Sequence, residues 1–382
     1  MGATDDFFIQ KGVSDSVVVK YLITTTLGPK TAAIKLCKEQ SLSNALGNDL
    51  NVIKKFSAKF IENSIERVNK NQFMVEVAFP PENCENSLSM MLSAVGGDTF
   101  NIKNLYPIKI LSISLSKPFY KKYGGPRYGV DGLRKKLKAY SRPILVGPVK
   151  PCIGMNPGAF AQRAREALLG GTDIVKDDEL ICNPPYNPLS SRTKLLSKTI
   201  RETERETGEK KMYFAFIGSG TPTQIIEYAE IAKDNGADGY MISPAINGFE
   251  IVKELKDEFQ LPIIAHNALA YSAYTPNHGM SFSVFSLLQR VCGADIVITP
   301  AKHGTFDVMS AEEHKENISV LHSKIAGIKR AFPAFCGGQK PETIPLLKKD
   351  AGNNDFIVVA GTSLYDHPDG PTAGAKRLRE RF

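Results

Sequence analysis

Eight short apolar runs recur along the later part of the chain, and each is followed by a longer stretch with helical periodicity. They cover residues 143–151, 172–179, 212–219, 239–245, 262–268, 294–302, 332–339 and 355–363. Apolar runs spaced about 25–40 residues apart are typical of parallel strands joined by crossover helices. Eight such units in roughly 250 residues predict a (β/α)8 TIM barrel. A doubly wound open sheet is the competing fold, but no GxGxxG follows the first run.

The earlier part of the chain has a different texture. Strand-like segments at 17–24, 72–79 and 108–115 are rich in β-branched residues and partly alternating, and helical stretches at 30–39 and 81–95 lie between them. This interleaving predicts an α+β unit with a small sheet and helices on one face. A glycine- and proline-containing turn at 123–126 marks a boundary. We therefore predict an α+β domain at 1–125 and the barrel at 126–382.

Polar and glycine residues cluster where the apolar runs of the barrel end. The carboxyl ends of barrel strands form one rim, where barrel enzymes build their active sites. The residues at these ends are Lys150, the 176–179 cluster, His266, Lys302, Gly337, Gly338, Gly361, Thr362 and Ser363. The pattern predicts an enzyme site on this rim.

Composition and charge narrow the class of protein. The net charge is +8, but basic residues are scattered among acidic ones, so we expect no nucleic-acid partner and an attraction for anionic small molecules instead. The six cysteines show no CxxC pairing, which suits reduced thiols. No apolar run approaches a membrane span, and the first residues lack the pattern of a secretory signal. We expect a cytoplasmic protein with no membrane partner.

The segment KDDE at 176–179 carries the clearest candidate chemistry. On a strand, Lys176 and Asp178 project to the same face, and Glu179 at the strand end can turn inward. The simplest interpretation is an ion pair between the lysine and the carboxylates. Alternatively, a neutral Lys176 takes up CO2 and becomes a carbamate, giving three oxygen donors that suit Mg2+.

Several motifs in a fixed order identify a resemblance that covers the chain from about residue 16 to its end. GGTDIVKDDE resembles the activation segment of the RuBisCO large-chain superfamily. It is accompanied by GPRYGVDGLR, RPIL, VKPCIGM, ETGE, NHGM, CGG and HPDGP. The resemblance implies a ferredoxin-like N-terminal domain, a C-terminal barrel, and a head-to-tail homodimer, or a dimer-based oligomer, with a shared active site.

The resemblance also implies roles for individual residues. Lys176 matches the carbamylated lysine, with Asp178 and Glu179 as the other Mg2+ ligands. Lys150 matches the acid/base lysine on the first strand. Two further active-site histidines are matched by His266 and His278, and Glu39 resembles the glutamate that the N-terminal domain supplies across the dimer.

Departures from the carboxylase pattern argue against CO2 fixation. Cys152 replaces a second lysine, Asn267 replaces a phosphate-binding arginine, and Ala270 replaces a histidine. Gly97 stands where an asparagine borders the metal. Thr305 stands in the place of the loop lysine, for which Lys302 is a possible substitute. Losing one oxyanion stabiliser typically costs about 2.7–4 kcal/mol. The pattern resembles the type IV RuBisCO-like proteins, with GPTAGAK near the end as in their photosynthetic-bacterial branch.

One anion site is expected beside the cation site. Gly337 and Gly338 after the seventh strand, and Gly361, Thr362 and Ser363 after the eighth, offer backbone N–H groups at the usual barrel phosphate position. Ordinary glycine turns are the alternative. Since the second phosphate site has lost its arginine, a monophosphate fits better than a bisphosphate.

These features predict Mg2+-assisted enolisation or isomerisation of a phosphorylated sugar-like substrate through an enediolate. Lys150 is the first candidate for the acid/base group, on the expectation that neighbouring cations lower its pKa, and the Lys176 carbamate is the second. Cys152 is either a substitute proton donor or an inert thiol. The alternatives are a decarboxylase of a 3-oxo sugar acid, a non-enzymatic sensor or scaffold, and a genuine carboxylase. The methionine-salvage enolase is disfavoured, because it has a lysine where Gly97 stands.

Overall fold

The computed structural model describes residues 5–12, 15–43, 49–305, 309–325 and 327–382, which divide into two compact units. One unit comprises Met1–Tyr123 and Ala270–Leu288, and the other comprises Gly124–Leu269 and Gln289–Phe382. The second unit begins close to the predicted boundary. The segment 270–288, which the sequence analysis assigned to the barrel, groups with the first unit because its strand β12 (Gly279–Met280) pairs in parallel with β6 (Ile108–Ser114).

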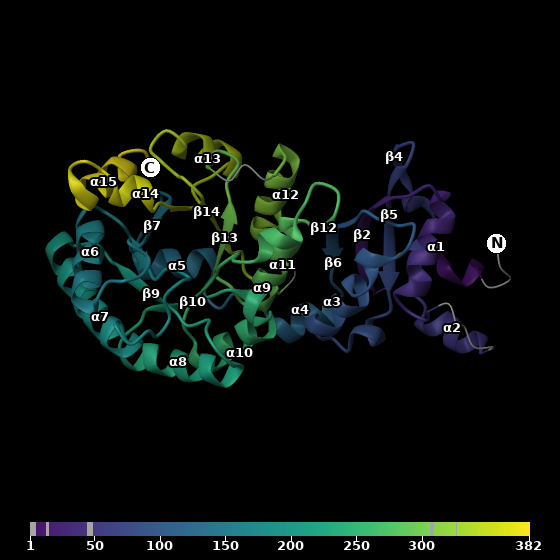
Figure 1. Cartoon of the computed structure of the whole chain (residues 1–382), viewed down its shortest axis with the longest axis horizontal. Coiled ribbons are helices and arrows are strands. Elements are labelled where there is room, and N and C mark those ends of the chain that lie inside the picture. Colours follow the sequence, from purple (N-terminus) through teal and green to yellow (C-terminus); the bar gives the residue numbers. More distant parts are fainter. Residues whose placement is uncertain (1–4, 13–14, 44–48, 306–308, 326) are drawn as a thin grey trace. The chain divides into compact units, whose positions relative to one another are not determined.

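The second unit is a closed barrel of eight parallel strands, ringed by helices in Figure 1. Its strands close in the order β10-β11-β13-β14-β15-β7-β8-β9. In chain order they are β7 (Ile144–Pro148), β8 (Ile174–Lys176), β9 (Met212–Phe216), β10 (Gly239–Ile242), β11 (Ile263–Ala265), β13 (Ile296–Pro300), β14 (Phe332–Cys336) and β15 (Ile357–Val359). Each lies within one of the eight predicted runs, so the predicted barrel is confirmed. Every strand is buried over nearly its whole length, which is why these runs are continuously apolar instead of alternating.

The helices of this unit follow the strands and are bounded by clear local signals. Thr221 and Ser310 each form a reciprocal capping box at the start of α8 and α12. The full set is α5 (Gly129–Leu137), α6 (Pro157–Leu169), α7 (Leu189–Thr207), α8 (Pro222–Asp234), α9 (Pro244–Asn247), α10 (Glu250–Phe259), α12 (Ala311–His322), α13 (Ile344–Ala351), α14 (Thr362–Tyr365) and α15 (Gly370–Arg379), while α11 (Phe282–Cys292) starts in one unit and ends in the other.

One end of the barrel is closed by α5. Its residues Val130, Leu133 and Leu137 belong to the same buried cluster as the inward-facing strand residues. The buried Asp295, just before β13, accepts hydrogen bonds from the backbone N–H groups of Tyr128 and Gly129 at 2.7 and 2.6 Å. Because α5 is tied to the amino end of β13, the carboxyl ends of the strands remain available for a site.

The first unit is built on a mixed sheet in the order β1-β3-β5-β2-β6-β12, with β4 paired to β5. In β2 (Val17–Thr24), alternate residues are fully buried, as the sequence pattern predicted. The other strands are β1 (Ile9–Gln10), β3 (Lys59–Ile61), β4 (Glu66–Asn69) and β5 (Gln72–Phe79). The α-helices are α1 (Pro29–Glu39), α2 (Leu50–Phe56), α3 (Leu88–Gly96) and α4 (Lys117–Tyr123), and the 3-10 turns are Asp5–Phe8, Glu62–Ser64, Pro81–Cys84, Thr99–Asn101 and Ala270–Ala273.

The single helix predicted at 81–95 is two elements. A 3-10 turn at Pro81–Cys84 is followed by Glu85 and Asn86 in left-handed backbone conformations, and α3 then begins after Ser87. The Ser87 side chain accepts the backbone N–H of Met90, which caps the new helix. Two left-handed residues cannot continue a right-handed helix, so the break is local in origin.

No helix in the described part of the chain combines the length and the apolar character needed to span a membrane. All six cysteines lie in described residues, and none of them forms a disulfide there.

Candidate active site

A cavity of about 690 Å³ opens at the carboxyl ends of the barrel strands. Ten of the predicted site residues line it: Lys150, Lys176, Asp178, Glu179, His266, Gly337, Gly338, Gly361, Thr362 and Ser363. They come from loops and strand ends spread along the sequence from Lys150 to Ser363. Closure of the barrel brings them together on one rim, as expected from strands that all point the same way.

The KDDE segment divides its side chains between the cavity and the barrel wall. Lys176, Asp178 and Glu179 line the cavity. Asp177 points the other way, is fully buried, and pairs with Arg192 of α7 at 3.0 Å. It also accepts hydrogen bonds from the Tyr213 hydroxyl at 2.8 Å and the Phe216 backbone N–H at 3.0 Å. This buried network fixes the backbone from which the three cavity residues project.

Lys176 is the most deeply buried cation of the cavity, with 2% of its surface exposed. Burial lowers the pKa of its amine, and the carboxylates of Glu179 and Asp178 only partly oppose that effect. The Nζ atom donates a hydrogen bond to the Asp177 carbonyl at 3.0 Å. A lowered pKa increases the fraction of neutral amine, which is the form that reacts with CO2.

The pKa of Lys150 shifts in the opposite direction to that of Lys176. The Lys150 Nζ atom lies 2.7 Å from Asp178 Oδ2 and 2.8 Å from Cys152 Sγ. Burial disfavours its charge, but the hydrogen bonds with Asp178 and Cys152 outweigh burial and raise the pKa of Lys150. A lowered pKa of Lys150 was expected from the sequence. The direction differs because the nearest charge is a carboxylate and not a cation.

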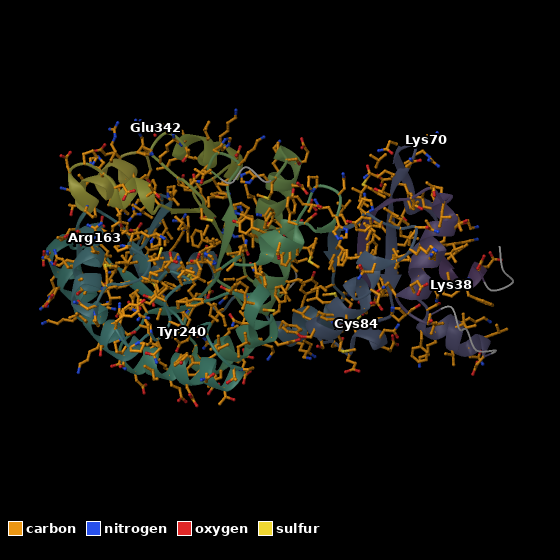
Figure 2. The ribbon with its side chains drawn as sticks, in the orientation of Figure 1. Lys38, Lys70, Cys84, Arg163, Tyr240 and Glu342 are labelled. Carbon is orange, nitrogen blue, oxygen red and sulfur yellow. The ribbon has the colours of Figure 1, made fainter. Side chains whose placement is uncertain are left out.

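The backbone carrying Lys150 is anchored from the helix ring. Arg163 of α6, labelled in Figure 2, donates from Nε to the Lys150 carbonyl at 3.2 Å and stacks its guanidinium over the Tyr365 ring. Gly361, after the neighbouring strand β15, lies beside the lysine: a Cβ atom there would be 3.4 Å from Lys150 Cε, an ordinary van der Waals contact.

His266 faces Glu179, with Nε2 lying 3.3 Å from Glu179 Oε2. Its Nδ1 atom accepts the backbone N–H of Ala268 at 3.1 Å, so the ring proton belongs on Nε2 and is directed at the carboxylate. Burial, together with the positive charge of Lys176, lowers the pKa of His266 to about 3. The ring is therefore neutral near pH 7.

The donor set fits a hard cation only if Lys176 is carbamylated. In the described residues, histidine, cysteine, aspartate and glutamate alone offer no group of three placed to hold a metal ion. Asp178 and Glu179 provide two carboxylates beside the amine of Lys176. A carbamate on that amine would supply the third oxygen ligand, the donor type that Mg2+ prefers. The residues present are therefore suited to Mg2+ on a carbamylated lysine.

The far wall of the cavity is made of glycine backbone. Gly337 and Gly338 follow β14 with φ of +89° and +71°, a region open to glycine at little cost. A Cβ on Gly338 would lie 2.5 Å from Thr305, so this backbone is also tightly packed. Ser363, at the start of α14, is tied to the same wall by a hydrogen bond from its hydroxyl to the Gln339 carbonyl at 2.5 Å.

Three predicted residues of the barrel unit do not line the cavity. Cys152 reaches it only through its contact with Lys150 Nζ. Asn267 is 1% exposed, and its side-chain oxygen accepts a hydrogen bond from Gln289 at 2.9 Å. Lys302 is partly exposed in the loop after β13. Position at a strand end is not sufficient to reach the cavity, because the next backbone torsions decide the direction of the side chain.

Two predicted residues belong to the first unit. Glu39 is the last residue of α1. His278 lies in the segment Ala270–Leu288, where its ring packs against Phe100 and Tyr106 with centroids 5.4 and 5.0 Å apart. Gly97, which stands in the asparagine position, ends α3 in the same unit.

The cavity also contains residues that the sequence analysis did not select, namely His303, Gly304, Gln339 and Lys340. His303 and Gly304 belong to the sixth-loop segment that was already noted for its unusual sequence. A histidine shortly after an apolar strand is the sequence signal that identifies His303 as a candidate.

Comparison with known proteins agrees with this geometry. The family model for the catalytic domain of the ribulose bisphosphate carboxylase large chain matches residues 129–382. A ribulose bisphosphate carboxylase-like protein of Archaeoglobus fulgidus is 34% identical over 82% of this chain and 72% of its own length. One from Chlorobaculum tepidum is 31% identical over 96% of this chain and 88% of its own.

Solved structures agree as well. The dimeric archaeal Rubisco of Hyperthermus butylicus is 26% identical, with a TM-score of 0.89, and covers 99% of this chain and 93% of its own. The octameric ribulose-1,5-bisphosphate carboxylase/oxygenase of Pyrococcus horikoshii is 28% identical, with a TM-score of 0.89 over 98% of this chain and 89% of its own.

The chain therefore belongs to the RuBisCO large-chain superfamily, and within it to the RuBisCO-like proteins. This superfamily is enzymatic in general and generally uses Mg2+ on a carbamylated lysine, and some of its RuBisCO-like members lack carboxylase activity.

Proposed function

We propose that this chain catalyses the Mg2+-dependent enolisation or isomerisation of a phosphorylated sugar-like substrate through an enediolate, without fixing CO2. The observation that carries the proposal is the setting of Lys176. It is a buried lysine of lowered pKa, flanked by two cavity carboxylates, in the same cavity as a glycine wall. This combination supports one cation site and one anion site for a single ligand.

The Mg2+ ion would be held by Asp178, Glu179 and the carbamate on Lys176. When bound, Mg2+ would supply positive charge that makes a hydrogen next to a carbonyl more acidic. His266 holds Glu179 in place by donating from Nε2, and its neutral state adds no competing cation.

Lys150 is our first candidate for the residue that exchanges a proton with the substrate. In its pairing with Asp178 it is a cation, suited to donating a proton to a substrate oxygen. If Asp178 is engaged elsewhere, the largest effect raising the pKa of Lys150 is removed, and burial then lowers it toward the range of a base. The Lys176 carbamate is the second candidate. Cys152 contacts the Lys150 amine and can hold it in place whether Lys150 donates or accepts the proton.

The anion site would take a single phosphate. The backbone of Gly337 and Gly338 and the start of α14 at Thr362 and Ser363 line the cavity on the side of β14 and β15. The position of the lost arginine, Asn267, is buried and engaged with Gln289. Loss of the second phosphate ligand favours a monophosphate over a bisphosphate.

We further propose a homodimer, or an oligomer of dimers, in which Glu39 of one protomer completes the site of its partner. Solved relatives described as dimeric and octameric support this proposal. Light scattering on the purified protein would test the assembly, and a monomer at micromolar concentration would contradict it.

The carbamate is tested without knowing the substrate. Protein incubated with 13C-bicarbonate and Mg2+ is expected to show one carbamate carbon resonance, which Lys176→Arg removes and Lys150→Arg retains. The resonance persisting in Lys176→Arg, or being absent from the wild type, would contradict the proposed cation site.

The reaction is tested with the loaded enzyme in D2O. Candidate sugar monophosphates are expected to take up deuterium without releasing CO2, and Lys150→Met is expected to lose this exchange. CO2 release would favour the rival decarboxylation of a 3-oxo sugar acid, which passes through the same enediolate. Fixation of 14CO2 on ribulose bisphosphate would overturn the proposal, and the absence of any metal-dependent turnover would favour a sensor or scaffold.

A further inference from the structure

A histidine pair bridged by one carboxylate stands beside the cavity, and the proposed reaction does not use it. His303, in the loop after β13, lines the cavity. Its Nε2 atom lies 2.8 Å from Oδ2 of Asp350 on α13. The same oxygen lies 3.4 Å from Nε2 of His314 on α12. The side chains are 25%, 22% and 1% exposed in that order, so the cluster runs from the cavity into the barrel wall.

The contact with Asp350 fixes the proton on the His303 ring. A carboxylate accepts a hydrogen bond, so Nε2 carries its hydrogen and donates it. Only Nδ1 is then left for a ligand, and it has no hydrogen-bond partner in the described part of the chain. A ring oriented by a carboxylate through one nitrogen presents the other in a defined direction.

The loop that carries His303 is packed against the glycine wall. Thr305 donates its backbone N–H to the Gly337 carbonyl at 2.8 Å. A Cβ on Gly304 would lie 1.9 Å from that same carbonyl oxygen, so only glycine allows this approach. His303 is therefore held next to Gly337 and Gly338, where the anion site is proposed.

Acidic and basic residues line different sides of the cavity. The acidic residues that line it, Asp178 and Glu179, follow β8. Among the described residues, the side of β13 and β14 contributes His303 and Lys340 together with the two glycines to the cavity lining, and none of these described residues is acidic. A dianion bound at the glycines would favour a protonated His303, and Asp350 would stabilise that charge from behind.

We propose that His303 is a binding residue for the dianionic phosphate-type group of the ligand, with Asp350 as its positioning residue. This inference rests on the phosphate site of the proposed function and assigns its specificity for a doubly charged group. The His303 ring, when protonated, donates from Nδ1 to an anion oxygen and adds one positive charge to the subsite.

Sulfate is a suitable probe, because it stays dianionic while histidine titrates. Calorimetric titration of the full-length protein at fixed ionic strength would compare the wild type with His303→Gln and Asp350→Asn at about pH 5.5 and about pH 8.5. His367→Gln is the matched control, because that ring also neighbours a carboxylate, Asp369 at 4.0 Å, but does not line the cavity.

At the lower pH we expect His303→Gln to bind sulfate about five- to tenfold more weakly than the wild type, and the difference to fall below about twofold at the higher pH. Asp350, which pairs with His303, His314, which lies on the same carboxylate, and Lys340, which lines the same cavity, are retained in His303→Gln, so the difference isolates the ring. Asp350→Asn keeps the ring but removes the charge behind it, and should shift the pH dependence of sulfate affinity to lower pH.

Sulfate binding separates a failure of the phosphate site from a failure of the role of His303. If the wild type binds no sulfate at either pH, the phosphate site of the proposed function is wrong, and this inference falls with it. If the wild type and His303→Gln bind equally at the lower pH, the phosphate site stands and the role of His303 is wrong. An unchanged pH profile in Asp350→Asn would overturn the positioning role. Circular dichroism of each variant establishes that it is folded.

Discussion

The neighbouring residues Asp177 and Asp178 should differ clearly in how much folding stability is lost when each is replaced by asparagine. Asp177→Asn removes the charge that faces Arg192, and both side chains are fully buried. Removing one partner of a buried pair costs about 3–5 kcal/mol, because the remaining charge stays buried without compensation. Asp178→Asn removes the partner of Lys150, whose side chain is 32% exposed. Solvent can then screen that amine, so we expect about 1 kcal/mol or less.

The two free energies of unfolding can be measured by urea denaturation. Since the chain has no tryptophan, far-ultraviolet circular dichroism is the signal of choice. With an unchanged m value, the midpoint of Asp177→Asn should fall clearly below that of Asp178→Asn. The 13C carbamate resonance should show the opposite order of effects. Asp178→Asn, which changes stability little, should weaken this resonance more than Asp177→Asn does.

A double variant sharpens the test of the buried pair. Asp177→Asn combined with Arg192→Met removes both charges, so its loss of stability should be smaller than the sum of the two single losses. Equal destabilisation by Asp177→Asn and Asp178→Asn, or strict additivity in the double variant, would refute the reasoning that Asp177 anchors the segment while Asp178 serves the cavity.

Three further outcomes are expected. His322 donates from Nε2 to the Asp355 carbonyl, and burial lowers its pKa, so the unfolded chain binds the extra proton first. Stability should therefore fall as pH drops below about 6.5, with a smaller slope in His322→Gln, as measured by urea midpoints. Gly304→Ala should weaken sulfate binding and cost about 1–3 kcal/mol, because its methyl group would meet the Gly337 carbonyl; unchanged binding and stability would contradict that packing. Glu39→Gln should slow deuterium exchange at least tenfold without changing the carbamate resonance, and an unaffected rate would remove Glu39 from the shared site.

The barrel could be predicted from sequence because its signal is local and repeated. Strands buried on both faces must be apolar throughout, and eight such runs leave few alternatives. The α+β texture of the first unit followed from a different local signal, the alternation of buried and partly exposed residues along β2 and most of β5. The break at Glu85 was missed, although the sequence carries a local signal for it: Asn86 tolerates the left-handed region and Ser87 is a helix-capping residue.

The place of 270–288 could not be predicted in the same way. Its two-residue strand β12 has no periodicity of its own and is defined by pairing with β6, far away in sequence. Pairing between remote segments is a property of the folded chain. His278 was therefore correctly noticed as a motif residue, but the unit that contains it became known only from the tertiary structure.

The sequence by itself determined the barrel and the order of its strands, and it also placed the residues that follow those strands at one rim. Alternation along β8 already separated Lys176 and Asp178 from Asp177. Tertiary structure decided the partners of the charged groups and the directions of their pKa shifts. Lys150 is paired with Asp178, which reverses the expected shift of its pKa. Asp350 on α13 reaches His303 in the loop after β13. The physical reason is range, because hydrophobic periodicity is written in neighbouring residues, whereas burial and charge pairing depend on distances that exist only after the chain has closed on itself.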